Sequence, residues 1–433
     1  MSTTLRLTGT LAAWSAMFLV VTCTPATAQN TQSSSKKEKQ ANEDIFEWGE
    51  HPSLHFGKGT RIDFRARLAG ELRDSEAPFD GDNARENIDI AKRRLGVAGQ
   101  IWNIVEFEVD AEVGSTNTWR DVYANYRQFD FVQVQGGKFK LPFSLDENTG
   151  ATKLDFVNRS RAATQLAPGR DIGVMVHGRL LERMFGYEVG IFNHDGDNAR
   201  TLNTDRVHGG QTFAARALAQ PFRRTKSLLS DLQVGVAMTR SDLPEGYPDL
   251  RGLTAMDMRF FRADAWVMGA RKRHGFEVRW RPGPASIKGE WMRVSDERLG
   301  QGVDDGPLSP LLGTGWYVSG TWALTGENKA NGVDNPRRPL FRGGYGAVEV
   351  AARVERITYG SKANDEAPSD GPRANVIPGN SDRVDTFGVN WYANRWIKVQ
   401  FNVVRDTLTD PILGPLPSQP SFWSRVFRFQ VSL

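Results

Sequence analysis

The amino-acid sequence predicts an all-β fold, a 16-stranded antiparallel transmembrane β-barrel. Apolar and polar residues alternate with period two from about residue 61 to the C-terminus, and the polar face is densely charged. Long connections alternate with short ones, as in membrane barrels. A soluble β-sandwich also alternates, but it does not require a densely charged face or aromatic residues near its strand ends. Together, these observations favour the barrel.

The first 28 residues (1–28) are interpreted as a secretory signal peptide. Arg6 gives a weak positive start, residues 7–21 are mostly apolar, and Ala26-Thr27-Ala28 fits an A-x-A cleavage site. An N-terminal membrane anchor is the alternative, but the apolar run is short and polar sequence follows it. The single cysteine, Cys23, lies in this segment, so we expect the mature chain to lack disulfides and cysteine ligands.

A polar N-terminal linker is predicted at residues 29–60, before a barrel domain at residues 61–433. The whole chain has 55 Lys and Arg against 51 Asp and Glu, and loss of Arg6 with the signal peptide lowers the formal net charge from +4 to +3. No later stretch reaches the ~18 apolar residues of a membrane helix. An exported chain of this kind either stays soluble outside the cytoplasm or inserts as a barrel.

The strands alternate clearly. "RIDFRARLAG", from residue 61, sets Phe64 and Leu68 against Arg65 and Arg67. The same pattern recurs at residues 104–113, 275–283 and 396–406 and in the last residues of the chain. Tryptophans suited to a membrane interface fall near strand ends at Trp280, Trp291, Trp322 and Trp391.

Connection lengths give the strand count. Long connections are expected at 142–168, 193–210, 241–273, 295–312, 359–381 and 407–421. Sixteen strands then start near residues 61, 88, 101, 119, 131, 170, 184, 211, 229, 274, 285, 313, 345, 383, 395 and 422. The connection 326–343 is long where a short turn is expected. Alternation from Met258 to Val267 is compatible with another strand, so the predicted number of strands is open by one pair.

Several segments resemble the phosphate-selective porin O and P family. They are "GKFKLPFSLDE" (137–147), "GRDIGVMVHG" (169–178), "GYEVGIFNHDG" (186–196), "WALTGENK" (322–329), "GAVEVAARV" (346–354) and "TFGVNWYANRWIKVQFNVV" (386–404). The resemblance implies a trimeric 16-stranded outer-membrane porin whose third external loop, here 142–168, folds into the lumen. It also implies that Arg and Lys from loops and wall form a narrow, anion-guiding eyelet.

Candidate ion-contacting residues follow from strand parity and loop position, because rings of Arg and Lys in a narrow pore can replace the water around an anion. The wall candidates are Arg65, Arg67, Lys92, Arg94, Arg127, Arg216, Arg279, Arg281, Lys288 and Arg353. Lys138 and Lys140 have the wrong parity unless a bulge at Gly136-Gly137 turns them inward. The loop candidates are Lys153, Arg159 and Arg161 in the third loop, and Arg259 and Arg262 in the fifth.

Acidic residues leave an alternative open. Glu106, Glu108, Asp110 and Glu112 share one strand face, so a general or carboxylate- or sugar-preferring porin with a transverse field is the main rival. These acids could instead pair with Lys92 and Arg94 on the adjacent strand. Within the third loop, Asp146, Glu147 and Asp155 could form salt bridges with the basic residues of the loop. The loop would then narrow the pore without making it ion-selective.

The sequence contains no convincing motif for catalysis or for metal or nucleotide binding. The sequence has no nucleophile-elbow, P-loop or dinucleotide-binding motif, and its six histidines show no convincing metal spacing. "DGDNAR" at 80–85 and 195–200 is interpreted as a turn rather than a Ca²⁺ site. We therefore expect no enzyme activity, cofactor, metal or nucleic acid. The expected partners are outer-membrane lipid, small anions such as phosphate, the outer-membrane assembly machinery and two further copies in a homotrimer. A barrel enzyme or an adhesin is the more distant rival.

Overall fold

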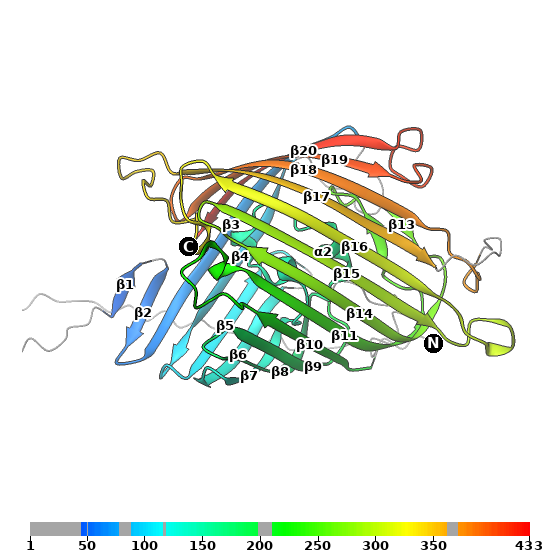
Figure 1. Cartoon of the computed structure of the whole chain (residues 1–433), viewed down its shortest axis with the longest axis horizontal. Coiled ribbons are helices and arrows are strands. Elements are labelled where there is room, and N and C mark those ends of the chain that lie inside the picture. The colour runs from blue at the N-terminus through cyan, green and yellow to red at the C-terminus, as the bar shows by residue number, and fades with distance from the viewer. Residues whose placement is uncertain (1–44, 50, 78–87, 116–117, 198–209, 362–370) are drawn as a thin grey trace, which may run out of the picture. The chain divides into compact units, whose positions relative to one another are not determined.

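The computed structural model describes residues 45–49, 51–77, 88–115, 118–197, 210–361 and 371–433. The predicted signal peptide and the first "DGDNAR" copy lie outside these ranges. Within them, sixteen long strands pair antiparallel in chain order, and the last pairs with the first. The closed 16-stranded barrel predicted from the sequence is therefore confirmed (Figure 1).

The barrel strands are β3 (Thr60–Ser75), β4 (Ile88–Ile101), β5 (Val105–Glu112), β6 (Trp119–Phe129), β7 (Val132–Lys140), β8 (Arg170–Leu180), β9 (Phe185–Phe192), β10 (Thr212–Ala219), β11 (Gln233–Gly246), β14 (Val267–Trp280), β15 (Ala285–Arg298), β16 (Leu308–Ala323), β17 (Ala347–Ser361), β18 (Asn380–Tyr392), β19 (Ile397–Leu408) and β20 (Ser421–Ser432). Most begin within a few residues of the predicted starts. The largest difference is β14, which begins at Val267 rather than near 274.

The segment that left the strand count open does not add a barrel strand. β12 (Arg251–Leu253) and β13 (Arg259–Arg262) pair only with each other, in a separate two-stranded sheet between β11 and β14. The remaining alternation up to Val267 leads directly into β14. The barrel count therefore stays at sixteen.

A short hairpin precedes the barrel, in the described part of the predicted 29–60 linker. β1 (Phe46–Trp48) pairs with β2 (Pro52–Phe56), and β2 pairs with the first residues of β3. β20 pairs with a later part of β3, from Arg67 to Ser75. The hairpin therefore continues the sheet beyond the β3–β20 seam (Figure 1).

The alternation separates two faces of the wall. In β20, Trp423, Phe427 and Phe429 are exposed, whereas Arg428 and Gln430, at the alternate positions, are buried. Exposed apolar side chains suit lipid, and the opposite parity places polar side chains inside the barrel. Among the described residues, no helix is both long and apolar enough to span a membrane.

Two connections at the loop end meet on the inner side of the wall. Helix α2 (Arg161–Leu166), between β7 and β8, contacts β15, β16, β17 and β12. The ring of Phe261 in β13 stacks on Tyr359 of β17 with centroids 4.9 Å apart. Leu166, Phe261 and Tyr359 belong to one buried apolar cluster. This cluster holds the 142–168 connection and the β12–β13 hairpin against the β15–β17 wall.

Candidate functional site

A large basic cavity lies within the barrel. Its volume is about 1730 Å³, and its lining includes 20 lysines and arginines against 11 aspartates and glutamates. The residues come from strands all round the wall and from the 142–168 connection between β7 and β8. Because the whole chain is nearly balanced, with 55 bases and 51 acids, the cavity concentrates positive charge.

Local hydrogen bonds shape the 142–168 connection. Ser144 caps the short helix α1 (Leu145–Asn148) by accepting a hydrogen bond from the backbone N–H of Glu147, 3.1 Å away. Ser160 caps α2 in the same way, accepting from Ala163 at 3.2 Å. Asn148 donates to the carbonyl of Phe143 at 2.8 Å. Caps of this kind satisfy the free N–H groups at the start of a helix and fix where the helix begins.

The same connection is bonded to the polar face of the β15–β19 wall. Glu290 of β15 accepts the backbone N–H groups of Leu145 at 2.9 Å and Asp146 at 2.6 Å. Asn402 of β19 accepts the N–H of Val157 at 2.8 Å. These partners are buried and point to the inner side of the wall. The connection is thus held by backbone and side-chain bonds spread over several strands.

Asp155 forms the most highly charged of these attachments. Its carboxylate pairs with Lys288 of β15 at 2.6 Å and with Lys329 at 3.0 Å, and Lys329 also pairs with Glu349 of β17. Lys398 of β19 donates to the neighbouring carbonyl of Leu154 at 2.6 Å. Burial by itself would raise the pKa of Asp155, but the two ammonium groups outweigh it and hold that pKa below the usual range.

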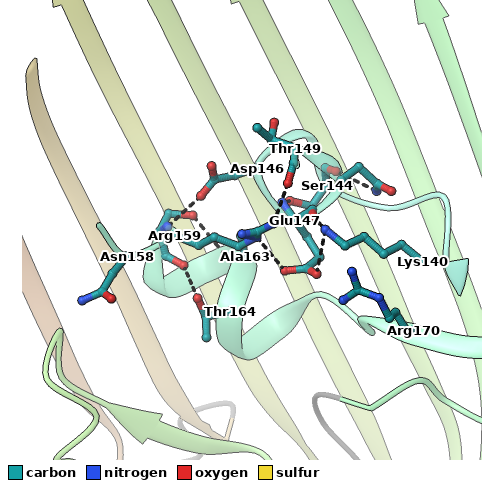
Figure 2. Close-up of polar contacts among 12 residues, drawn as sticks. Lys140, Ser144, Asp146, Glu147, Thr149, Asn158, Arg159, Ala163, Thr164 and Arg170 are labelled. Atoms are coloured by element: carbon teal, nitrogen blue, oxygen red, sulfur yellow. Dashed lines mark hydrogen bonds and ion pairs between the residues drawn. The ribbon is translucent and has the colours of Figure 1, made fainter. Parts of the chain in front are cut away.

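Glu147 forms a second charged cluster, at the end of β7. Lys140 lies 3.4 Å and Arg159 3.1 Å from its carboxylate oxygens (Figure 2). Burial opposes ionisation of Glu147, yet Lys140, Arg159 and Arg170 together hold its pKa below the usual range. Asp146 instead accepts the N–H of Ser160 at 2.7 Å. Of the connection's own bases, Glu147 therefore neutralises Arg159, whereas Lys140 belongs to β7 and Asp155 pairs with lysines outside the connection.

Arg353 of β17 lies behind the connection. Its guanidinium donates to the carbonyls of Asn158 at 3.1 Å and Arg159 at 3.4 Å, and it pairs with Glu355 at 2.9 Å. It also lies over the ring of Phe156, 4.5 Å from the centroid. This wall base supports the connection and does not line the main cavity.

The acidic face of β5 is paired with arginines. Arg94 lies 3.4 Å from Asp110 and 3.1 Å from Glu112, and Arg65 lies 3.2 Å from Glu108. The pairing with Arg94 was one of the two alternatives raised by the sequence; Lys92 forms no such pair among the described residues. Glu108 and Asp110 also approach Asp121 within 4.8 Å. Asp121 is itself bonded to Arg170 at 2.9 Å, so arginines compensate this acidic group.

Some bases lining the cavity have no carboxylate within ion-pair distance among the described residues. Arg67 and Lys92, on β3 and β4, and the exposed Lys153 of the connection are of this kind. Arg279 of β14 bonds only the amide oxygen of Gln233, at 2.9 Å. Two guanidinium nitrogens of Arg67 are buried without a hydrogen-bond partner. These positive charges remain available to a solute.

The structure distributes the predicted residues over different environments. The candidates that line the cavity are Arg65, Arg67, Lys92, Arg94, Lys140, Lys153, Arg159, Arg161, Arg216, Arg279, Arg281 and Lys288. Arg161 is almost fully buried and donates to the carbonyl of Thr254 at 2.9 Å. Arg127 pairs with Glu106 at the barrel end, Arg262 is exposed beside Asp264, and Arg259 lies on β13; none of the three lines the cavity.

The bulge at Gly136-Gly137 that would turn Lys138 and Lys140 inward is not formed. β7 pairs in continuous register through both glycines with β8, and with β6 from Val134 to Lys138. Lys138 consequently keeps its outward parity and donates to the carbonyl of Trp119 at 2.9 Å. Lys140 reaches the cavity for another reason. It is the last residue of β7, where the chain turns into the connection and parity no longer applies.

Sequence reasoning missed several bases that line the cavity: Arg120, Arg170, Lys329, Lys398 and Arg428. Strand parity could have found Lys398 and Arg428, which sit on the polar faces of β19 and β20. Lys329 lies in a connection, and Arg120 and Arg170 lie at strand ends, where no pattern indicated an inward direction.

The second "DGDNAR" copy has a structural role in its described part. Asp195 is buried and pairs with Arg271 at 2.7 Å and with Arg273 on β14. Burial opposes its ionisation, but these two guanidinium groups hold the pKa of Asp195 below the usual range. The aspartate thus fastens the β9–β10 connection to the inner wall.

Comparison with known proteins places the chain in a class of membrane channel. The sequence profile of the phosphate-selective porin O and P family matches residues 63–410. The chain therefore belongs to this family and is an outer-membrane porin, a barrel for passive diffusion. The family and the similar barrels point to a channel without enzymatic activity. A search of curated protein sequences finds no match.

Solved structures share the fold at low sequence identity. OmpT of Vibrio cholerae has a TM-score of 0.52 at 14% identity, covering 88% of this chain and 99% of that chain. The DcaP channel of Acinetobacter baumannii has a TM-score of 0.51 at 9% identity, with coverage of 88% and 99%. Salmonella typhi OmpF, in complex with daunomycin, has a TM-score of 0.50 at 10% identity, also with 88% and 99%. These likenesses show the fold alone.

Proposed function

We propose that this porin passes small anions in preference to cations, with phosphate or polyphosphate as the first candidates. The excess of bases over acids in the cavity lining carries the proposal. Each unit charge about 5 Å from a permeating ion changes its energy by ~1 kcal/mol even in bulk water, and by more where the surroundings are less polar. The summed charge of the lining therefore favours anions.

The proposed constriction is the 142–168 connection folded into the barrel. Its support is the set of bonds from this connection to inward-facing residues of β15, β17, β18 and β19. Lys153 and Arg159 of the connection line the same cavity as residues of β3 and β4. A connection attached to one side of the lumen leaves the passage on the other side, next to Arg67 and Lys92.

Passage requires release as well as attraction. A guanidinium offers a planar fork of donors that can bind two oxygens of a phosphate or carboxylate. Several bases of moderate strength in series let the ion move from one to the next, whereas a single tight site would trap it. Among the described residues, bases without carboxylate partners occur on several elements, including β3, β4, β14 and the connection. That spacing suits stepwise diffusion.

The rival, a general porin with a transverse field, rests on the acidic face of β5. In the structure, that face lies beside Arg65 and Arg94 of the two preceding strands and forms ion pairs with them. A paired carboxylate contributes much less to the field at the pore axis than a free one. The observation favours the anion-preferring function.

We also propose a homotrimer, consistent with the trimer form in which OmpT of Vibrio cholerae was solved. Strands β5, β9 and β10 have only 8 residues each, whereas a membrane-spanning strand needs about 9–11. The β8–β10 face exposes the apolar residues Ile172, Ile191 and Phe213. A neighbouring copy would cover this short wall. Light scattering of the purified protein tests the assembly, and a monomeric mass would contradict it.

A planar bilayer tests the selectivity. The purified full-length protein should form channels whose reversal potential in a KCl gradient has the sign of anion preference. Added inorganic phosphate should reduce the chloride current because both anions compete for the same bases. Cation preference would contradict the anion proposal. Chloride current insensitive to phosphate would remove phosphate as the preferred solute.

A further inference from the structure

A row of exposed cations follows the outer surface of the barrel from β11 to β20. It consists of Arg240, Lys272, Arg293, Arg356, Arg383, Arg405 and Arg425, and we refer to it as the outer basic row. All seven residues are exposed. They share the parity of the exposed apolar residues, so they project away from the pore. Each lies three to six residues inside the loop end of its strand.

The row contains like charges placed side by side. Arg240 lies directly opposite Lys272 on β14, and Arg356 lies directly opposite Arg383 on β18. Like charges in directly opposite positions destabilise a sheet. Opposite charges on this face compensate the row only in part. Lys272 pairs with Glu297, Arg383 with Asp385 and Arg425 with Asp74, at 2.7, 3.2 and 2.9 Å.

The other four cations have no carboxylate within ion-pair distance among the described residues. Arg356 donates to the hydroxyl of Ser381 at 3.0 Å, and Arg405 to that of Ser421 at 3.4 Å. Arg240 and Arg293 make no side-chain bond to any described residue. The unpaired positive charges of the outer basic row lie at a similar height on the barrel. Binding of an external anion there would stabilise this surface.

The row borders the apolar band of the barrel. Arg240 follows Met238 by two residues on β11, and Arg293 follows Trp291 on β15. Arg425 precedes Phe427 by two on β20. Trp423 and Met268, which lie nearer the loop end than the row, are also exposed, so the cations stand in the border zone of the apolar band, where the polar headgroup of a lipid begins.

The opposite rim of the same wall differs in chemistry. Its outward residues include the aromatic residues Trp280, Trp322 and Trp391, together with aliphatic ones such as Ile287. The indole N–H groups of Trp280 and Trp391 donate to the carbonyls of Leu228 and Tyr345, both at 2.8 Å. Such a belt suits an ordinary phospholipid interface. Basic residues at one rim and aromatic residues at the other indicate two leaflets with different headgroups.

We propose that the outer basic row binds the phosphate groups of the glycolipid in the outer leaflet. The row lies at the end of the barrel that carries the long connections, such as 141–169 and 247–266, and long connections face the cell exterior in outer-membrane barrels. Arginine is suited to phosphate because it donates two parallel hydrogen bonds. One sugar-linked phosphate between Arg356 and Arg383 would offset their mutual repulsion. The acyl chains would lie on the apolar band below.

The first experiment compares two glycolipids on the unmodified protein. Folded full-length protein in detergent is titrated with bisphosphorylated lipid A and with chemically dephosphorylated lipid A, and bound lipid is counted by native mass spectrometry. We expect the phosphorylated form to bind about tenfold more tightly or better, because charge-assisted hydrogen bonds are lost without the phosphates. Equal affinity for the two forms overturns the proposal.

The second experiment tests the location with a matched pair of variants. Arg356→Gln/Arg383→Gln removes one directly opposed pair from the row. Arg251→Gln/Arg262→Gln removes another directly opposed pair, which lies on β12 and β13 outside the barrel wall. The first variant should bind bisphosphorylated lipid A about tenfold more weakly, and the control should bind like the unmodified protein. A first variant that binds normally, or an equal loss in both, overturns the location.

The inference is independent of pore selectivity, since the row faces away from the lumen. Conductance and ion preference of Arg356→Gln/Arg383→Gln should remain those of the unmodified protein. If that variant does not fold, the comparison of the two glycolipids on the unmodified protein still decides the question.

Discussion

Two groups of inward-facing bases occupy the same barrel and differ in what they contact. Lys288, Lys329 and Lys398, on the β15–β19 side, are bonded to the 142–168 connection. Arg67 and Lys92, on β3 and β4, line the cavity without a carboxylate partner among the described residues. Lys288 and Lys398 share the inward strand parity of Arg67 and Lys92, and Lys329 reaches the same inner side from the connection between β16 and β17. The difference shows that an inward-facing lysine or arginine can either bond the long connection or line the cavity without a carboxylate partner, according to which groups the connection places beside it.

The largest effect should come from the anchoring group. Asp155→Asn leaves Lys288 without a carboxylate partner among the described residues and Lys329 with Glu349 alone, and breaking a buried ion pair such as Asp155–Lys329 typically costs about 3–5 kcal/mol. We expect a large drop in the thermal stability of the connection and a raised, noisier single-channel conductance. Single-channel recording and limited proteolysis of the 142–168 segment measure the two effects.

Asp334→Asn is the matched control for this variant. It removes the same charge from the cavity lining, but Asp334 is exposed and forms no ion pair with a described residue. Its conductance should remain close to that of the unmodified protein. Similar behaviour of the two variants would mean that the pairs of Asp155 do not hold the connection.

The group without carboxylate partners should influence selectivity and leave stability unchanged. Arg67→Gln/Lys92→Gln removes two charges beside the proposed passage. At ~1 kcal/mol for each charge, the ratio of anion to cation permeability should fall by about tenfold or more. The reversal potential in a KCl gradient measures this ratio. Arg127→Gln, also on the inner parity but outside the cavity lining, should leave the ratio unchanged. An unchanged ratio in the double variant would mean that these bases lie off the ion path.

The smallest effect is expected from pH. The pKa values of Asp155 and Glu147 are held below their usual ranges, so their ion pairs stabilise the folded state fully above those ranges. This stabilisation is lost only as pH falls through the lowered values, when the carboxylates take up protons. The ion pairs of Asp155 and Glu147 should therefore stay formed from pH 8 to about pH 5 and break only in stronger acid. In the Asp155→Asn variant, the acid-induced loss of protease resistance of the 142–168 segment should become smaller; an unchanged loss would contradict the assigned pairs.

The fold could be predicted from the sequence because the wall of a membrane barrel repeats one simple rule. Lipid on one side and water on the other impose a strict alternation, and long connections separate one rim from the other. The prediction was least accurate where both faces of a strand are polar. At the start of β14, Arg271 and Arg273 face inward while Lys272 and His274 face outward, so the alternation disappears and the strand start was placed seven residues too late.

The site was less predictable because its roles depend on contacts between distant residues. Parity indicated that Lys288 faces inward, but not that Asp155, 133 residues earlier, would neutralise it. Parity placed both Arg353 and Arg67 on the inner face as candidates to contact the ion, although Arg353 bonds the carbonyls of the connection. Parity also fails at strand ends, which explains Lys140 and the missed Arg170. A pattern in the sequence shows which face a side chain is on, and the tertiary fold decides what it meets there.

The ion pair between Lys329 and Asp155 joins connections from opposite rims of the barrel. Lys329 belongs to the 324–346 connection, which lies at the end with the short turns, and Asp155 to a connection that starts from the other end. This buried ion pair links a connection at one mouth of the channel to the proposed constriction near the other. A force applied to the 324–346 connection would therefore reach the 142–168 connection through Lys329 and Asp155.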